Sequence, residues 1–170
     1  MSKLSGAEKF ILLGIPVLFI LGSPLHFVYE LTGSHFIIGL LVPSNESVFQ
    51  HTKMVTIPII LWWKIYYLCH KRSLDRDRWF TAAFVSLCAA VISMPGLFYY
   101  YSGMFGVELL IVDIFIVLAS LLIGQLVGLH FYRHCRGMNG VLASALIIAV
   151  IVLAAVLTAF PPNIPMFISR

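Results

Sequence analysis

Long apolar runs separated by short polar segments dominate the chain. The runs lie at residues 10–31, 48–69, 79–101, 105–130 and 141–160. Each is long enough to cross a bilayer, since a transmembrane helix needs ~20 residues. Lipid cannot hydrogen-bond to an exposed backbone, so these runs must be helical. The pattern predicts an all-α membrane protein, a bundle of about five transmembrane helices forming one polytopic domain over residues 1–170.

The apolar stretch between the first two runs differs from the others. Residues 35–42 cover only ~12 Å as a helix, because each residue adds ~1.5 Å. This length is too short to cross the hydrocarbon core. We therefore expect a short interfacial or re-entrant segment after the first helix.

The composition agrees with this assignment. Hydrophobic residues make up 61% of the chain and charged residues 11%, and the mean hydropathy is +1.00. These values are typical of an integral membrane protein whose principal partner is the lipid bilayer. The net charge of +4 resides in loops, as membrane insertion requires, so no nucleic-acid partner is expected.

The basic residues predict the orientation. Lys3 and Lys9 begin the chain, residues 70–78 carry four more basic side chains, and Arg133 and Arg136 follow the fourth run. With five spans these segments share one side, and the intervening loops contain neither Lys nor Arg. Because Lys and Arg are retained in the cytoplasm, the N-terminus should be cytoplasmic and the C-terminus extracytoplasmic.

Polar side chains gather at the opposite, outer end of the predicted bundle. His26 and Glu30 end the first run four residues apart, so they share one helix face. Intramembrane ionisable groups are costly and usually mark function. The other members begin or end the next three runs: Asn45, Glu46, His51, Lys53, Tyr100, Glu108 and Asp113.

Helix capping offers a simpler explanation for part of this group. Pro43 precedes Asn45 and Glu46, and both of these residue types favour the first turn of a helix. In such a helix Glu46 and His51 would lie ~140° apart and could not form a same-face pair. Capping does not account for His51 or Lys53.

Asp113 lies deepest among the acids of this group. It is ~12 Å into a helix that begins at Phe105. An acid at this depth needs a partner, because burial disfavours an isolated charge. We expect that partner to be His51 or His26.

These residues suggest a one-sided site with separable roles. Histidines bind divalent metals such as zinc, and carboxylates act as acids, bases or further ligands. The assignment is His26 and His51 for metal, Glu30, Glu46 and Asp113 for catalysis, and Asn45, Lys53, Tyr100 and Glu108 for substrate binding. The corresponding function is a metal-dependent or acid–base hydrolase acting on a lipid or lipid-linked group. A non-catalytic binding or partner protein, or a proton- or cation-coupled transporter, would use the same groups.

Two further motifs have competing interpretations. His130 and His134 form an H-x-x-x-H pair that suits zinc, but Arg133 between them favours contact with anionic headgroups. Gly124 and Gly128 form a GxxxG pattern, which allows close approach between membrane helices. This pattern predicts a contact within the bundle, a homo-oligomer or another membrane-protein partner.

The segments LHFVYELTG and VPSNESVFQHTKM, with the later GVELLIVDI and GQLVG, resemble an uncharacterised family of small bacterial multi-spanning membrane proteins. The shared patterns are H-F-x-Y-E and P-x-N-E-S-V-aromatic-x-H-x-K. The resemblance implies a location in the bacterial cytoplasmic membrane but no particular activity. The stretch NESVFQH is also similar to a helix start in progestin and adiponectin receptor-like hydrolases, which bind zinc but have more spans and a longer spacing from acid to histidine.

Overall fold

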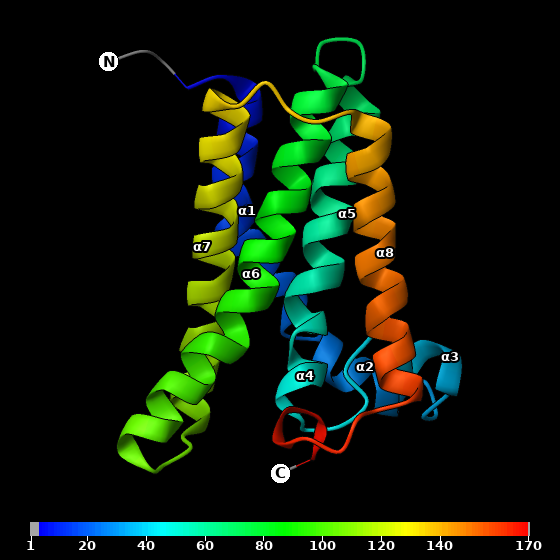
Figure 1. Cartoon of the computed structure of the whole chain (residues 1–170), viewed down its shortest axis with the longest axis vertical. Coiled ribbons are helices and arrows are strands. Elements are labelled where there is room, and N and C mark those ends of the chain that lie inside the picture. Colours follow the sequence, from blue (N-terminus) through cyan, green and yellow to red (C-terminus); the bar gives the residue numbers. More distant parts are fainter. Residues whose placement is uncertain (1–3, 170) are drawn as a thin grey trace.

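The computed structural model describes residues 4–169, and in that range the chain is a helical bundle without strands. Four helical segments are long and apolar enough to cross a membrane. They are α1 with α2 (Gly6–Leu31), α6 (Arg76–Phe105), α7 (Leu110–His134) and α8 (Gly140–Ala159). These helices run alongside one another (Figure 1). The predicted fold class, a helical bundle of membrane type, is confirmed.

The first predicted run is one crossing with a break near its end. Helix α1 spans Gly6–Gly22 and α2 spans Leu25–Leu31. Pro24, at the N-cap of α2, has no backbone N–H to continue the helical ladder. The break lets α2 take its own direction, and α2 carries His26 and Glu30.

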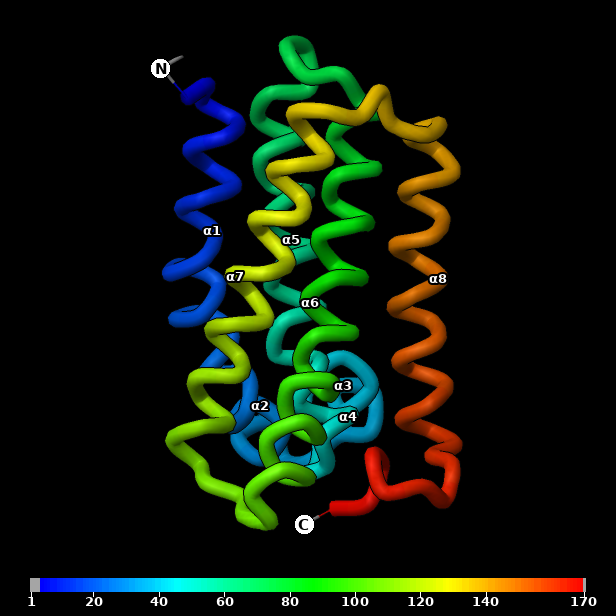
Figure 2. Tube along the Cα trace, turned by 60° about the vertical axis from the view of Figure 1, so that its left-hand side comes forward, coloured from blue at the N-terminus to red at the C-terminus, as the bar shows by residue number. Residues whose placement is uncertain are grey.

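The second predicted run is divided into two helices. Helix α4 covers only Val48–His51, and α5 covers Lys53–His70. Helix α5 runs alongside the other long helices and packs against α1 and α6 (Figure 2), but it is not one of the four segments that meet the length and apolarity of a span. The structure therefore contains four candidate crossings, whereas the sequence pattern suggested about five.

The segment at residues 35–42 does not cross the bundle. It forms a single short helix, α3 (Phe36–Gly39), followed by a turn. Helices α2, α3 and α4 gather at one end of the molecule (Figure 2). The prediction of a short element that does not span is confirmed by this placement.

Helices α6 and α7 approach closely through the glycines of the GxxxG motif. A Cβ atom at Gly124 would lie 2.8 Å from the Ala90 Cβ, and one at Gly128 would lie 2.8 Å from the Ser86 Cβ. Both glycines are buried inside this chain. Of the alternatives for this motif, the structure shows the contact within the bundle, against α6; a partner at Gly124 and Gly128 stays a prediction.

The two ends of the bundle have different character. The basic end contains the starts of α1, α6 and α8 and the ends of α5 and α7, with the Lys- and Arg-rich loops (Figure 1). The site end contains α2, α3, α4, the α6–α7 connection and a short 3-10 helix, η1 (Pro165–Phe167). Phe167 stacks on Phe49 of α4, with ring centroids 4.4 Å apart.

Candidate metal-binding site

A close contact between α1 and α5 brings the two halves of the site together. Gly22 ends α1, and a Cβ atom there would lie only 2.6 Å from the Met54 carbonyl oxygen. His26 follows Gly22 by four residues, and His51 precedes Met54 by three. The missing side chain of Gly22 therefore allows the approach that places these histidines side by side.

The loop before α4 is shaped by its own side chains. Asn45 Oδ1 accepts a hydrogen bond from Ser47 N at 2.9 Å. Ser47 is the N-cap of α4, and its hydroxyl oxygen accepts one from Gln50 N at 3.3 Å. The Asn45 side chain therefore stabilises the turn before α4, in keeping with the capping interpretation. Glu46 has a different role, because its side chain extends from this turn toward α2.

Glu46 lies between the two histidines. Its Oε1 is 3.0 Å from His26 Nε2, and its Oε2 is 3.6 Å from His51 Nε2. The imidazole rings are stacked with centroids 5.3 Å apart. Our expectation that Glu46 and His51 cannot meet is wrong. It assumed one continuous helix, whereas Glu46 precedes the start of α4 and its position is set by a turn.

The His51 ring is held in a fixed orientation. Its Nδ1 lies 2.9 Å from the Ser47 carbonyl oxygen. A proton on Nδ1 donated to that carbonyl leaves the Nε2 lone pair free toward Glu46. Metal-binding histidines usually have such a second hydrogen bond, which fixes the tautomer and the ring direction. His26 differs, since its Nδ1 is buried without a hydrogen-bond partner among residues 4–169.

The donor atoms of His26, Glu46 and His51 fit one divalent metal ion. One ligand atom from each residue can be chosen so that all lie within 4.8 Å of one another. Tetrahedral zinc with bonds of ~2.0–2.1 Å separates neighbouring ligand atoms by roughly 3.3 Å. The distances from the Glu46 carboxylate, 3.0 Å to His26 Nε2 and 3.6 Å to His51 Nε2, lie on either side of that value. Two imidazoles and one carboxylate leave a fourth position open for water or substrate.

A polar pocket of about 170 Å³ adjoins this cluster. Glu30 lines it, four residues after His26 on α2, together with Tyr29 of the same helix. Ser44 and Asn45 line the side formed by the loop. Glu30 is exposed and lines the same pocket as His26 and Glu46, so all three side chains border one space.

Lys53 does not face this pocket. It is 1% exposed, and its ammonium donates hydrogen bonds to the carbonyl oxygens of Gly39 at 2.6 Å and Val42 at 3.2 Å. Our expectation that Lys53 contacts substrate is therefore not met. Lys53 instead ties the end of α3 to the start of α5, which fixes the loop carrying Glu46.

The residues expected from α6 and α7 lie outside the pocket. Asp113 accepts a hydrogen bond from the Tyr101 hydroxyl at 2.8 Å, and that hydroxyl oxygen accepts one from Leu109 N at 3.1 Å. The partner of Asp113 is therefore Tyr101 and not a histidine. Tyr100 and Glu108 are exposed, and neither lines the pocket. This second polar group joins α6 to α7.

Sequence reasoning paired the histidines but missed two roles. Glu46 was assigned to catalysis, whereas its carboxylate lies where a third metal ligand would be. Tyr101 belongs to the tyrosines that end the third run at the outer surface, but its pairing with Asp113, 12 residues later, was not predicted. His130 and His134 lie at the basic end, and no described group of three potential ligands includes them.

The whole chain, residues 1–170, matches the model of a family described as a family of unknown function, DUF6512. The chain belongs to this family. No curated protein and no solved structure matches it. The family supports the resemblance to an uncharacterised group and assigns no activity.

Proposed function

We propose that this DUF6512 member is a metal-dependent hydrolase that acts on a lipid-like substrate at the outer surface of a bacterial cytoplasmic membrane. The observation that carries the proposal is the convergence of His26, Glu46 and His51 at the edge of a polar pocket. Two of the three come from α2 and α4, and Glu46 comes from the loop between α3 and α4. A packing role alone does not require three potential ligands from separate segments.

The chemistry follows from the donor set. Three protein ligands with an open fourth position are typical of catalytic zinc, which lowers the pKa of its bound water and polarises a carbonyl or phosphoryl oxygen. Glu30 lines the same pocket and can accept a proton from an attacking water. In this assignment Glu46 is a ligand and Glu30 the general base.

The surroundings support a lipid-like substrate. The apolar side chains of Leu31 in α2 and of Phe36 and Ile37 in α3 are 83%, 65% and 75% exposed. They lie at the same end of the bundle as the polar pocket. These side chains and the four candidate spans support a site at an apolar boundary. A substrate with a polar group and an apolar tail fits both surfaces.

One observation favours a second candidate, a non-catalytic binding protein. His26 Nε2 and the Glu46 carboxylate are close enough to form a charge-assisted hydrogen bond without a metal ion. In that case the cluster is a polar latch between α2 and the loop before α4. The pocket would then bind a ligand without changing it.

Metal analysis of the purified protein tests the proposal. We expect about one equivalent of zinc in the wild type. His26→Gln, His51→Gln and Glu46→Gln each remove a ligand, so the zinc affinity of each variant should fall at least ~10-fold and its zinc content should fall with it. His35→Gln is the matched control, since His35 is an exposed histidine at the same end but outside the cluster. Equal zinc content in all four variants would refute the metal site.

The Glu30→Gln variant separates enzyme from binding protein. As a general base, Glu30 acts after metal binding, so this variant should keep zinc and lose hydrolysis of a lipid ester or phosphoester by about 10²–10⁴-fold. Lipid identification in the same purified sample defines which substrate to assay. A zinc-loaded wild type that hydrolyses none of its bound lipids would favour the binding role.

A further inference from the structure

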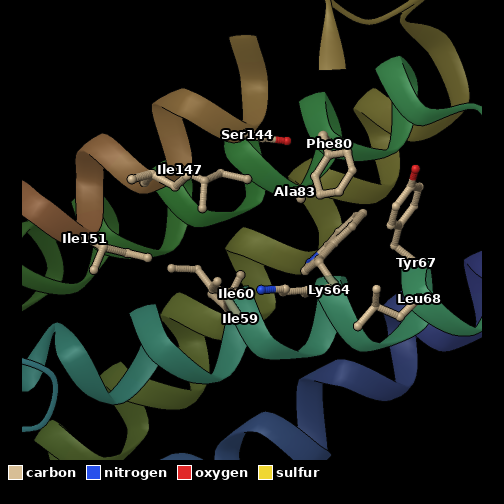
Figure 3. A pocket seen from close by; sticks show the side chains of 12 residues that line it. Ile59, Ile60, Lys64, Tyr67, Leu68, Phe80, Ala83, Ser144, Ile147 and Ile151 are labelled. Carbon is tan, nitrogen blue, oxygen red and sulfur yellow. The ribbon is translucent and has the colours of Figure 1, made fainter. Parts of the chain in front are cut away.

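A second pocket lies far from the metal cluster, toward the basic end of the bundle. This Lys64 groove has a volume of about 300 Å³, within the range of ligand pockets. It opens between α5, α6 and α8, and Figure 3 shows side chains from all three helices around it. Its lining includes Ile59, Lys64, Tyr67, Ser144 and Ile151.

The groove has a polar and an apolar end. Lys64 lies six residues before the end of α5 and Ser144 four residues into α8, so their backbones are only ~9 Å and ~6 Å from the helix ends. Ile59 and Ile151 each lie 11 residues from those ends, or about 17 Å. Figure 3 shows the isoleucines of α8 running away from Ser144. Figure 3 shows the Lys64 nitrogen directed toward Ile60, inside the groove, so a lipid phosphate paired with it would lie next to the isoleucines that contact the acyl chain.

Lys64 supplies a cation without a counter-ion. It is exposed, and no ion pair or hydrogen bond of its side chain occurs among residues 4–169. The acids at the same end are engaged elsewhere. Glu8 pairs with Arg133, and Asp77 accepts a hydrogen bond from Gly140 N at 2.7 Å. An anion from outside the chain would neutralise Lys64, and a charge close to hydrocarbon favours such a partner.

A second copy of the chain is a poorer source of this anion, because Asp77 in α6 and Asp113 in α7 already accept hydrogen bonds within their own chain. The chain has seven acidic residues, and none of them lies within α5 or α8. The only one inside α1 is Glu8, which already pairs with Arg133. A bilayer lipid, in contrast, brings a phosphate to this depth and an acyl chain into the groove.

We propose that the Lys64 groove binds one anionic phospholipid, with its phosphate paired to the Lys64 ammonium and one acyl chain between α5 and α8. This site is independent of the metal cluster and of any activity there. Lysine near an anionic headgroup favours the charged lipid by about fivefold over a neutral one. The apolar lining adds affinity for the acyl chain of the lipid but does not distinguish charged from neutral lipids.

Lipid retention in nanodiscs tests the charge preference. The probe is phosphatidylcholine containing a minority of phosphatidylglycerol, and native mass spectrometry counts lipids that remain bound after detergent extraction. We expect phosphatidylglycerol to be enriched about fivefold in the wild type, and the enrichment to vanish in Lys64→Gln but persist in Lys64→Arg. Lys71→Gln, in the exposed loop after α5, is the control. Equal loss in Lys64→Gln and Lys71→Gln would show diffuse attraction by the basic end and overturn the proposal.

A larger side chain in the groove tests where the acyl chain of the lipid lies. Ile148 lines the groove and is 59% exposed, so Ile148→Trp should fold while obstructing the bound chain. Val152 on the same helix is 55% exposed but does not line the groove, which makes Val152→Trp the matched control. We expect lipid retention to fall at least fivefold only in Ile148→Trp. Unchanged retention in that variant, with wild-type helicity, would exclude the groove as the binding site.

Discussion

The basic end and the site end are stabilised in different ways. At the basic end, side chains cap the starts of three helices, and a few contacts, such as that between Glu8 and Arg133, join distant segments. Ser5 and Glu8 form a capping box on α1, Asp75 caps α6 and Asn139 caps α8. At the site end, the important contacts join segments that are distant in sequence. The basic end is therefore stabilised largely by caps at helix starts and by exposed pairs, whereas the site end holds its side chains through contacts between separate segments.

The same contrast holds for the charged groups. Arg133 and Glu8 form an ion pair at the surface of the basic end, where solvent weakens it. Lys53 at the site end is buried and bound by two backbone carbonyls. Removing a partner from a buried group costs more than breaking an exposed pair, because the remaining group is left without water. Substitutions at the two ends should therefore differ in effect.

Gly22→Leu should have the largest effect. The new side chain collides with the Met54 carbonyl, since even its Cβ would lie 2.6 Å from that oxygen. We expect destabilisation of at least about 1–3 kcal/mol and loss of zinc, because α1 and α5 separate near His26 and His51. Thermal unfolding in detergent, followed by circular dichroism, and metal analysis measure these outcomes.

Gly96→Leu is the control for that variant. Nothing lies within 4 Å of a Cβ at Gly96 in α6, and leucine has the better helix propensity by about 1 kcal/mol. Its stability should equal or exceed that of the wild type. A Gly22→Leu protein as stable as Gly96→Leu would contradict the close contact.

Lys53→Met should come second. The variant leaves the Gly39 and Val42 carbonyls without their buried donor, at a cost of about 1.5–3 kcal/mol. Since Lys53 holds the loop that carries Glu46, zinc affinity should also fall, by about 10–100-fold. Isothermal titration with zinc checks the affinity, and Lys71→Met, at an exposed position, should change neither quantity. Unaltered zinc binding in Lys53→Met would remove its positioning role.

Asp75→Ala should have a smaller effect, confined to the basic end. Asp75 Oδ1 accepts a hydrogen bond from Arg78 N at 3.1 Å at the start of α6. Loss of such a cap costs about 1 kcal/mol. The melting temperature should fall slightly while zinc affinity stays constant. A change in zinc affinity would indicate that the two ends are coupled and would contradict their separate stabilisation.

Arg133→Gln should have the smallest effect. The pair with Glu8 is partly exposed, and such pairs contribute about 0–1 kcal/mol. The difference in stability from the wild type should shrink as salt is added, because ions screen surface charges. Unfolding measured at low and high ionic strength tests this. A salt-independent loss would mean that Arg133 packs against the bundle as well.

Local sequence patterns determined the fold class and most helices. Apolar runs predicted α6, α7 and α8 to within a few residues, because lipid leaves no alternative to hydrogen-bonded helices. Pro24 marked the break between α1 and α2. The i, i+4 spacing placed His26 and Glu30 on one face of α2, and both line the same pocket.

Tertiary structure alone decided how the candidate site is assembled. A continuous helix would place Glu46 and His51 on different faces. The chain instead turns before α4, and Glu46 Oε2 lies 3.6 Å from His51 Nε2. The buried position of Lys53 depends on the carbonyls of Gly39 and Val42, 14 and 11 residues earlier. The partner of Asp113 is Tyr101 because the short connection after Phe105 brings the start of α7 back beside the end of α6. Such contacts join residues whose separation in the chain carries no periodic signal, so only the packing of helices against one another fixes them.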